Sequence, residues 1–140
     1  MNKIEEKARA EVKKYLERQG KKVIERKDTG DLEYDGIHVE VKGDGDDWYC
    51  EQGERIRDWV VLGSKRETEY FEDSPDKFEL WCVGCLKRNK SKYPMVQIKG
   101  SELKEFINKN PDKEQHLLKI IMGKEFWKNR KIEFIWNDDK

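Results

Sequence analysis

The segment DLEYDGIHVEVKG, residues 31–43, predicts a β-hairpin with a defined register. Its Asp35-Gly36 pair suits a two-residue turn, because both central positions of such a turn favour a positive φ, which Asp and Gly tolerate. Counting outward from this turn gives the cross-strand pairs Tyr34–Ile37, Glu33–His38, Leu32–Val39 and Asp31–Glu40. We therefore expect two carboxylates to lie side by side at the open end of the hairpin.

The two faces of this hairpin are expected to differ sharply in polarity, because side chains alternate between faces along a strand. One face carries the apolar residues Leu32, Tyr34, Ile37, Val39 and Val41. The other carries Asp31, Glu33, His38, Glu40 and Lys42. Many half-exposed hairpins combine an apolar inner face with a charged outer face, so this pattern also fits a purely structural role.

The charged face contains groups that suit metal-dependent hydrolysis. Carboxylates at adjacent cross-strand positions have Cβ atoms about 5 Å apart, close enough for both to bind one divalent cation. Two carboxylates at this distance repel each other unless positive charge lies between them, and a metal ion with Lys42 would supply it. A divalent metal can acidify a nucleophilic water and neutralise the charge that develops during phosphodiester hydrolysis.

The hairpin is expected to stand in an α/β context. Residues 3–19 carry a stripe of apolar side chains at helical spacing, and Gly20 is a natural helix stop. A short strand is expected over residues 21–26. After the hairpin, residues 51–63 favour a helix, with WVVL as an alternative buried strand, and residues 64–77 are expected to form a loop.

The second half of the chain alternates between apolar and charged stretches. FELWCV, residues 78–83, and residues 93–99 are expected to be strands, and LKRNKSK between them a loop. Gly100-Ser101 is expected to introduce a helix. Leu117, Leu118, Ile120 and Ile121 predict a last helix, and residues 131–136 a final strand.

Asp31 followed by Glu40-Val41-Lys42, after a helix that stops at Gly20 and a strand, resembles the PD-(D/E)XK nucleases. The resemblance covers about residues 1–45. It implies a restriction-endonuclease-like fold, in which helices flank a mixed central sheet around an αβββαβ core, similar to archaeal Holliday junction resolvases. The length of 140 residues fits one such domain, over residues 1–140.

The resemblance implies a Mg²⁺- or Mn²⁺-dependent nuclease that acts on DNA more readily than on RNA. Asp31 and Glu40 would bind the metal, the Val41 backbone carbonyl would add a ligand, and Lys42 would assist the attacking water. Whether such an enzyme is an endonuclease or an exonuclease stays open. Many nucleases of this class are dimers, so a homodimer is one expected assembly.

Two positions depart from the family pattern. Gly30 stands where a Pro often precedes the Asp, and Arg9 stands where the resolvases carry a helix acid. Accessory acids on this helix would have to come from Glu5, Glu6 or Glu11. The missing acid keeps a second hypothesis open, in which the chain is an inactive nuclease-fold module that binds nucleic acid.

Trp81-Cys82-Val83-Gly84-Cys85 supports a third hypothesis, a small zinc or redox protein. Zinc would need two further ligands, from Cys50 and from His38 or His116. The loop that follows is too short for the helix that a redox motif of this kind needs. An odd number of cysteines without an export signal favours reduced thiols.

Residues outside the hairpin are candidates for nucleic-acid contact. Four cations crowd one loop, Lys87, Arg88, Lys90 and Lys92, where they could hold a phosphate backbone. Gln52 and Arg55 follow the hairpin and could line a substrate groove. His38 lies two residues before Glu40 and is either an accessory group near the metal or an ion-pair partner of Glu33.

The charge distribution agrees with a cation-binding site between phosphate-binding flanks. Charged residues make up 43% of the chain, against about 25% in typical proteins, and this density resembles thermophilic proteins. Residues 31–80 carry 16 acidic and 6 basic side chains, although the net charge is zero. No membrane span and no signal peptide is visible, so a cytoplasmic location is expected.

Overall fold

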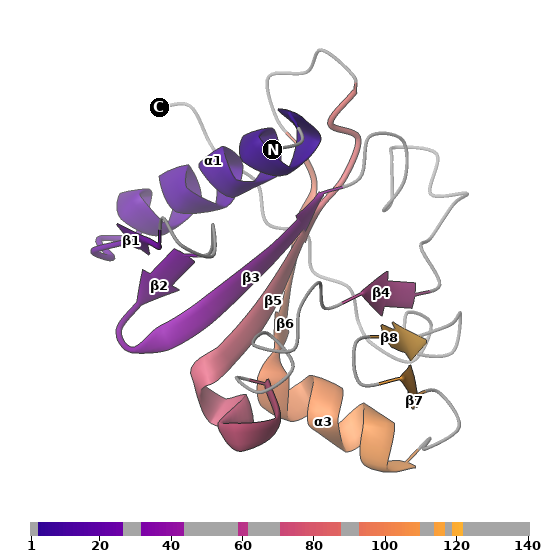
Figure 1. Ribbon diagram of the computed structural model, residues 1–140. Helices are drawn as coiled ribbons and strands as arrows, with labels where there is room; N and C mark the ends of the chain where they lie inside the picture. Colours follow the sequence, from indigo (N-terminus) through magenta and orange to yellow (C-terminus); the bar gives the residue numbers. More distant parts are fainter. Residues whose placement is uncertain are drawn as a thin grey trace.

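A five-stranded mixed sheet forms the centre of the computed structural model (Figure 1). The structure describes residues 3–26, 32–43, 59–61, 71–87, 93–109, 114–116 and 119–121. The helices are α1 (Lys3–Arg18) and α3 (Gly100–Lys109), with a 3₁₀ turn, η1 (Pro75–Lys77). The strands of the large sheet are β1 (Ile24–Glu25), β2 (Leu32–Tyr34), β3 (Ile37–Gly43), β5 (Phe78–Val83) and β6 (Met95–Lys99).

The β2–β3 hairpin has the register that the sequence predicts. Its pairs are Leu32–Val39, Glu33–His38 and Tyr34–Ile37. Asp35 and Gly36 both have positive φ, 50° and 75°, as a two-residue turn of this type requires. The expected strand over residues 21–26 is shorter than predicted, since only Ile24 and Glu25 pair with β2.

The strand order β1-β2-β3-β5-β6 combines antiparallel and parallel pairs. β3 pairs with β5 in parallel, from His38 opposite Phe78 to Gly43 opposite Val83, and β5 pairs with β6 antiparallel. This mixed sheet with packed helices confirms the α/β class. It also makes β3 an internal strand, so the residues of the hairpin lie in the middle of the sheet.

Helix α1 packs on one face of this sheet through its predicted apolar stripe. Ala8, Val12 and Leu16 are buried. The helix ends in a Schellman motif, because the amide of Lys21 donates to the Leu16 carbonyl and the amide of Gly20 donates to the Glu17 carbonyl, both at 3.0 Å. Gly20 has the positive φ of 82° that this motif favours.

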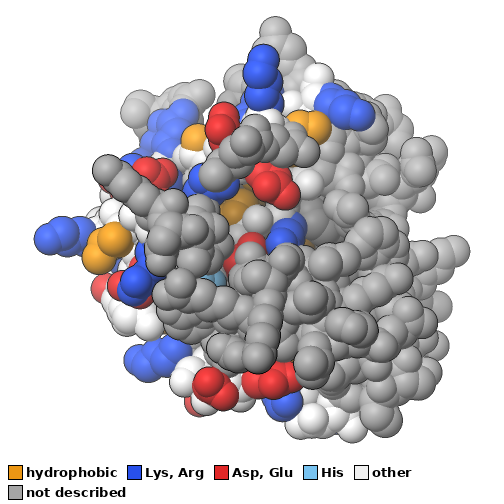
Figure 2. Space-filling model, viewed as in Figure 1, with side chains coloured by type: hydrophobic (Ala, Val, Ile, Leu, Met, Phe, Trp, Pro, Cys, Tyr) orange, Lys and Arg blue, Asp and Glu red, His pale blue; other side chains and the backbone are white. Residues whose placement is uncertain are grey.

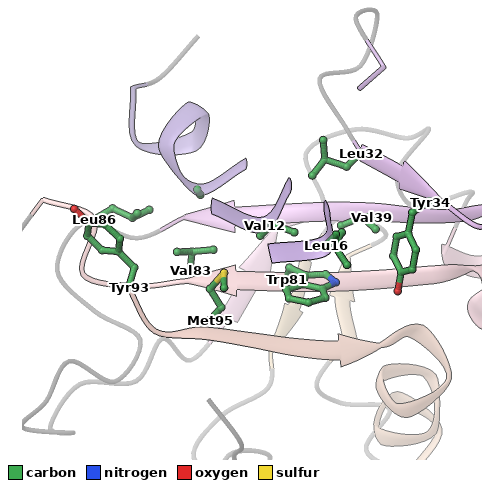
Figure 3. Close-up of a cluster of buried hydrophobic side chains, with 11 residues drawn as sticks. Val12, Leu16, Leu32, Tyr34, Val39, Trp81, Val83, Leu86, Tyr93 and Met95 are labelled. Atoms are coloured by element: carbon green, nitrogen blue, oxygen red, sulfur yellow. The ribbon is translucent and has the colours of Figure 1, made fainter. Parts of the chain in front are cut away.

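The core under α1 joins the helix to the four strands β2, β3, β5 and β6 and to residues between β5 and β6 (Figure 3). It holds Ala8, Val12, Leu16, Leu32, Tyr34, Val39, Trp81, Val83, Leu86, Tyr93 and Met95. Every residue that β3 and β5 contribute is odd-numbered, as expected when alternate side chains face α1. The even-numbered side chains of β3 and β5 therefore point to the other side of the sheet, away from α1.

A second, three-stranded sheet corrects two predictions. It contains β4 (Trp59–Val61), β8 (Lys119–Ile121) and β7 (Glu114–His116) in the order β4-β8-β7. The helix expected over residues 51–63 is wrong at residues 59–61, where the alternative strand is confirmed. The last helix expected from Leu117, Leu118, Ile120 and Ile121 is also wrong at residues 119–121, where β8 pairs with β4. Short apolar runs rich in β-branched residues suit either state, and distant pairing decides between them.

Two further segments differ from the sequence-based expectation or lie beyond it. The expected loop over residues 64–77 contains a helical turn at residues 71–73 and η1. The final strand expected over residues 131–136 lies outside the described residues. The predicted helix after Gly100 is confirmed as α3. None of the described helices combines the length and the apolar character needed to span a membrane.

Candidate functional site

The face of the large sheet that points away from α1 carries a compact group of charged and polar side chains. His38, Glu40 and Lys42 are alternate residues of β3, so they share this face. Val39 on the opposite face is buried in the α1 core, and Val41 packs against that core. The predicted separation of the hairpin into an apolar face and a polar face is confirmed for residues 32–42.

Glu40 and Lys42 form an ion pair at the centre of this group. Lys42 Nζ lies 3.2 Å from Glu40 Oε1, and the two side chains are 19% and 5% exposed. A carboxylate loses much of its hydration when it is buried to this degree and therefore needs compensating charge. Lys42 supplies this charge while its own side chain still reaches solvent.

His38 lies on the other side of the Glu40 carboxylate. Its Nε2 is 3.7 Å from Glu40 Oε2, and its side chain is 5% exposed. The imidazole stacks on the Phe78 ring, with ring centroids 5.7 Å apart and an interplanar angle of 19°. Glu33, the ion-pair partner that the sequence suggested for His38, accepts a hydrogen bond from Arg26.

The neighbouring strand gives this group an apolar border. Three buried residues of β5 lie opposite the charged and polar residues of β3 in the parallel register. The pairs are His38–Phe78, Glu40–Leu80 and Lys42–Cys82. Charges beside such a surface are poorly screened, so their mutual interactions are stronger than they would be in water. Figure 2 shows acidic and basic side chains close to one histidine in the middle of this view.

Asp31, the predicted partner of Glu40, lies outside the described residues. The described register ends one pair earlier, at Leu32 opposite Val39. Glu40 and Lys42 are therefore the predicted catalytic residues that the structure brings together. The role expected of Val41 belongs to its backbone carbonyl, and its side chain packs on the α1 side.

The accessory acids proposed on the first helix do not join this group. Glu5, Glu6 and Glu11 belong to α1, which covers the opposite face of the sheet. Glu5 and Glu6 are exposed, and Glu11 is half-buried. The sheet itself separates α1 from the side chains of Glu40 and Lys42.

One predicted nucleic-acid contact can be placed relative to the site. Lys87 is exposed and follows the carboxyl end of β5. Because β3 and β5 are parallel, with Lys42 opposite Cys82, this end of β5 lies beside the Lys42 end of β3. The other candidates lie outside the described residues, namely Arg88, Lys90, Lys92, Gln52 and Arg55.

The two cysteines of the CxxC segment differ in state. Cys85 is disulfide-bonded, and Cys82 is a buried thiol at the end of β5. The expectation of reduced thiols is therefore wrong for Cys85. In this state Cys82 and Cys85 do not act together as a pair of thiolate ligands or as a redox dithiol.

The chemistry of Glu40 suits a divalent cation. Its carboxylate supplies hard oxygen donors, is held in one orientation by Lys42 and stands in a largely water-excluded setting. Within the described ranges, which do not include Asp31, no cluster of three or more His, Cys, Asp or Glu side chains is arranged to hold a metal. Of the predicted catalytic residues that the structure describes, Glu40 is thus the one whose side chain can bind a metal ion.

A second buried carboxylate, Glu79, did not stand out in the sequence. Its Oε1 accepts hydrogen bonds from the Tyr34 hydroxyl at 2.8 Å and from Trp81 Nε1 at 3.0 Å. Burial and the bond to Glu79 raise the pKa of Tyr34 well above its ordinary value. The alternation of FELWCV was the available signal, since it places Glu79 on the same face as Trp81. This network lies on the α1 face, across the sheet from Glu40.

We found no match to this chain among protein-family models, curated proteins or solved structures.

Proposed function

We propose that this protein is a nuclease of the PD-(D/E)XK class, which hydrolyses phosphodiester bonds of nucleic acid with Mg²⁺ or Mn²⁺. The observation that carries the proposal is the ion pair of buried Glu40 with partly exposed Lys42, 3.2 Å apart on an internal strand. The described hairpin register supports it, because its pairs are those from which the sequence predicts Asp31 opposite Glu40.

The arrangement of the sheet supports the same class. A helix packs against a hairpin, and the second strand of that hairpin pairs in parallel with a later strand. This order is compatible with the restriction-endonuclease-like core that the resemblance implies. We extend the proposal to that fold family and to DNA as the preferred substrate, on the strength of the resemblance.

Each site residue has a defined task in this proposal. Glu40 would hold the divalent cation together with Asp31, and the Val41 carbonyl would add a backbone ligand. When bound, the cation would acidify a coordinated water and stabilise charge on a phosphate oxygen. Lys42, partly exposed and already oriented by Glu40, donates to the attacking water or to the phosphate. Lys87, beyond β5 at the same end of the sheet, contacts the backbone of the nucleic acid.

Cleavage assays with matched variants test this proposal. Purified protein would be incubated with single-stranded, double-stranded and branched DNA, and with RNA, in the presence of Mg²⁺ or Mn²⁺. We expect cleavage by the wild type and a loss of at least about 100-fold in Glu40→Gln and Lys42→Ala. Lys109→Ala is the control, because Lys109 forms an exposed pair with Glu105 on α3.

The outcomes separate an enzyme from a binding module. Circular dichroism would establish that each variant is folded. Equal cleavage by the wild type and by folded Glu40→Gln or Lys42→Ala would overturn the proposed site. Tight binding of DNA without turnover by the wild type, in either metal, would instead favour the inactive nucleic-acid-binding module.

A further inference from the structure

The imidazole of His38 is held rigidly at the edge of the proposed metal site. It is buried and stacks on Phe78, and Phe71 contacts the same Phe78 ring in an edge-on arrangement at 5.5 Å. Phe78 is itself 1% exposed. A ring supported in this way keeps its orientation without any metal, which lowers the entropic cost of recruiting it as a ligand.

The two oxygens of Glu40 face different partners. Oε1 is 3.2 Å from Lys42 Nζ, whereas Oε2 is 3.7 Å from His38 Nε2. The ion pair thus orients the carboxylate so that its second oxygen faces the imidazole. On the far side of His38, the cross-strand neighbour Glu33 is engaged by Arg26. The His38 ring thus lies beside Oε2 of Glu40.

The spacing of these two donor atoms is close to that of ligands on one metal ion. Two adjacent ligands of an octahedral ion, each at a bond length of about 2.1 Å, lie about 3 Å apart. The separation of His38 Nε2 and Glu40 Oε2 is 3.7 Å. The observed separation thus exceeds the octahedral spacing by about 0.7 Å.

We infer that His38 Nε2 is a direct ligand of the divalent cation held by Glu40, and that this nitrogen makes the site prefer Mn²⁺ to Mg²⁺. The inference rests on the proposed nuclease site and adds to it a ligand and a metal preference. Neutral imidazole is a common ligand of transition metals, whereas Mg²⁺ favours oxygen ligands and retains its water.

Spectroscopy of bound Mn²⁺ tests the ligand without relying on activity. Electron spin-echo modulation would be recorded for Mn²⁺ bound to the wild-type protein, with natural histidine and with ¹⁵N-labelled histidine. We expect a ¹⁴N signature that changes on labelling. The chain has two histidines, so His116→Asn is the matched control and should keep the signature. His38→Asn should remove it and weaken Mn²⁺ binding at least about tenfold, with a smaller effect on Mg²⁺.

The result separates this inference from the proposed function. If Mn²⁺ binds in a manner that Glu40→Gln abolishes, yet the wild type shows no histidine nitrogen signal, His38 is not a ligand and the inference is overturned while the metal site stands. If the wild type binds neither Mn²⁺ nor Mg²⁺, both are overturned. The labelling experiment uses the wild type, so it remains decisive even if His38→Asn fails to fold.

Discussion

Lys42 Nζ lies 3.2 Å from Oε1 of Glu40, and the pair is placed on an internal strand, where Glu40 is 4% exposed. The two residues are separated by one position on the same strand, so their contact needs no distant segment. The surroundings of the pair do depend on a distant segment, because β5 lies alongside β3. The ion pair therefore links a local sequence pattern to the packing of the whole sheet.

Removal of the Lys42 charge should lower the stability of the protein as well as its proposed activity. Lys42→Met leaves the buried Glu40 carboxylate without its ammonium partner, which we expect to lower the free energy of unfolding by about 2–4 kcal/mol. The double variant Glu40→Gln/Lys42→Met should recover most of this loss, because it removes both charges. Urea denaturation of the four proteins in this cycle would measure the coupling. Additive effects of the two substitutions would contradict a buried ion pair.

The hairpin turn should be sensitive to a side chain at position 36. Gly36 has a φ of 75°, and a Cβ there would meet no atom within 4 Å. Gly36→Ala should therefore cost about 1 kcal/mol through backbone strain alone. Asp35→Gly should cost less than Gly36→Ala, since glycine accepts the φ of 50° at this position and the Lys21–Asp35 ion pair that is lost is exposed. Chemical denaturation of both variants tests this, and an equal loss in both would contradict it.

Gly43 should be intolerant of any side chain because helix α1 passes close to it. A Cβ at this position would lie 2.9 Å from Ala8 Cβ and 2.8 Å from Leu86 Cδ1. We expect Gly43→Ala to cost about 1–3 kcal/mol of unfolding free energy by overpacking. Ala8→Gly should then be less damaging in the Gly43→Ala background than in the wild type. Thermal denaturation measures this coupling, and simple additivity would argue against the close approach.

The hydrogen bond from Tyr34 to Glu79 should make stability fall at alkaline pH. Burial, followed by the Glu79 bond, raises the pKa of the Tyr34 hydroxyl above the ordinary value of about 10. A group whose pKa is raised by folding stabilises the native state below its unfolded pKa. The protein should therefore lose stability as the pH rises above about 10. Tyr34→Phe should weaken this pH dependence.

Two measurements check the Tyr34 prediction. Tyrosinate absorbance should show one tyrosine fewer at high pH in the unfolded Tyr34→Phe variant, but an unchanged titration while both proteins remain folded. Denaturation at neutral pH should show a loss of about 1–2 kcal/mol in the variant, because Glu79 loses one buried donor. A Tyr34 that titrates normally in the folded wild type would refute the assignment.

Several elements could be predicted from local sequence because their signals are strong and short in range. The Asp35-Gly36 turn set the register of the hairpin, and the alternation around it assigned Glu40 and Lys42 to one face. Helix α1 was readable from its apolar stripe and its glycine stop. In each case the interactions that determine the secondary structure lie within a few residues of one another. The backbone preferences and the hydrophobic pattern therefore predict the same element.

The pairing of distant segments could not be read in this way. The composition of the run around Ile120 suits either a helix or a strand. It forms strand β8 because it pairs with β4, about 60 residues earlier in the chain. Local sequence likewise does not predict that the His38 ring lies beside the Glu40 carboxylate. That relationship follows from Phe78, which β5 places against the His38 ring.

The amino-acid sequence alone thus determined the turn, the register and the polar face that carries Glu40 and Lys42, because period-two alternation and a glycine turn act locally. Only the tertiary structure decided that β5 lies alongside the strand that carries this face, that Glu40 is buried there beside Lys42, and that α1 with its acids lies on the opposite side. These features depend on the parallel pairing of β3 with β5, which are joined by a long connection. A pairing between segments so far apart in the chain cannot be predicted from the residues next to either strand.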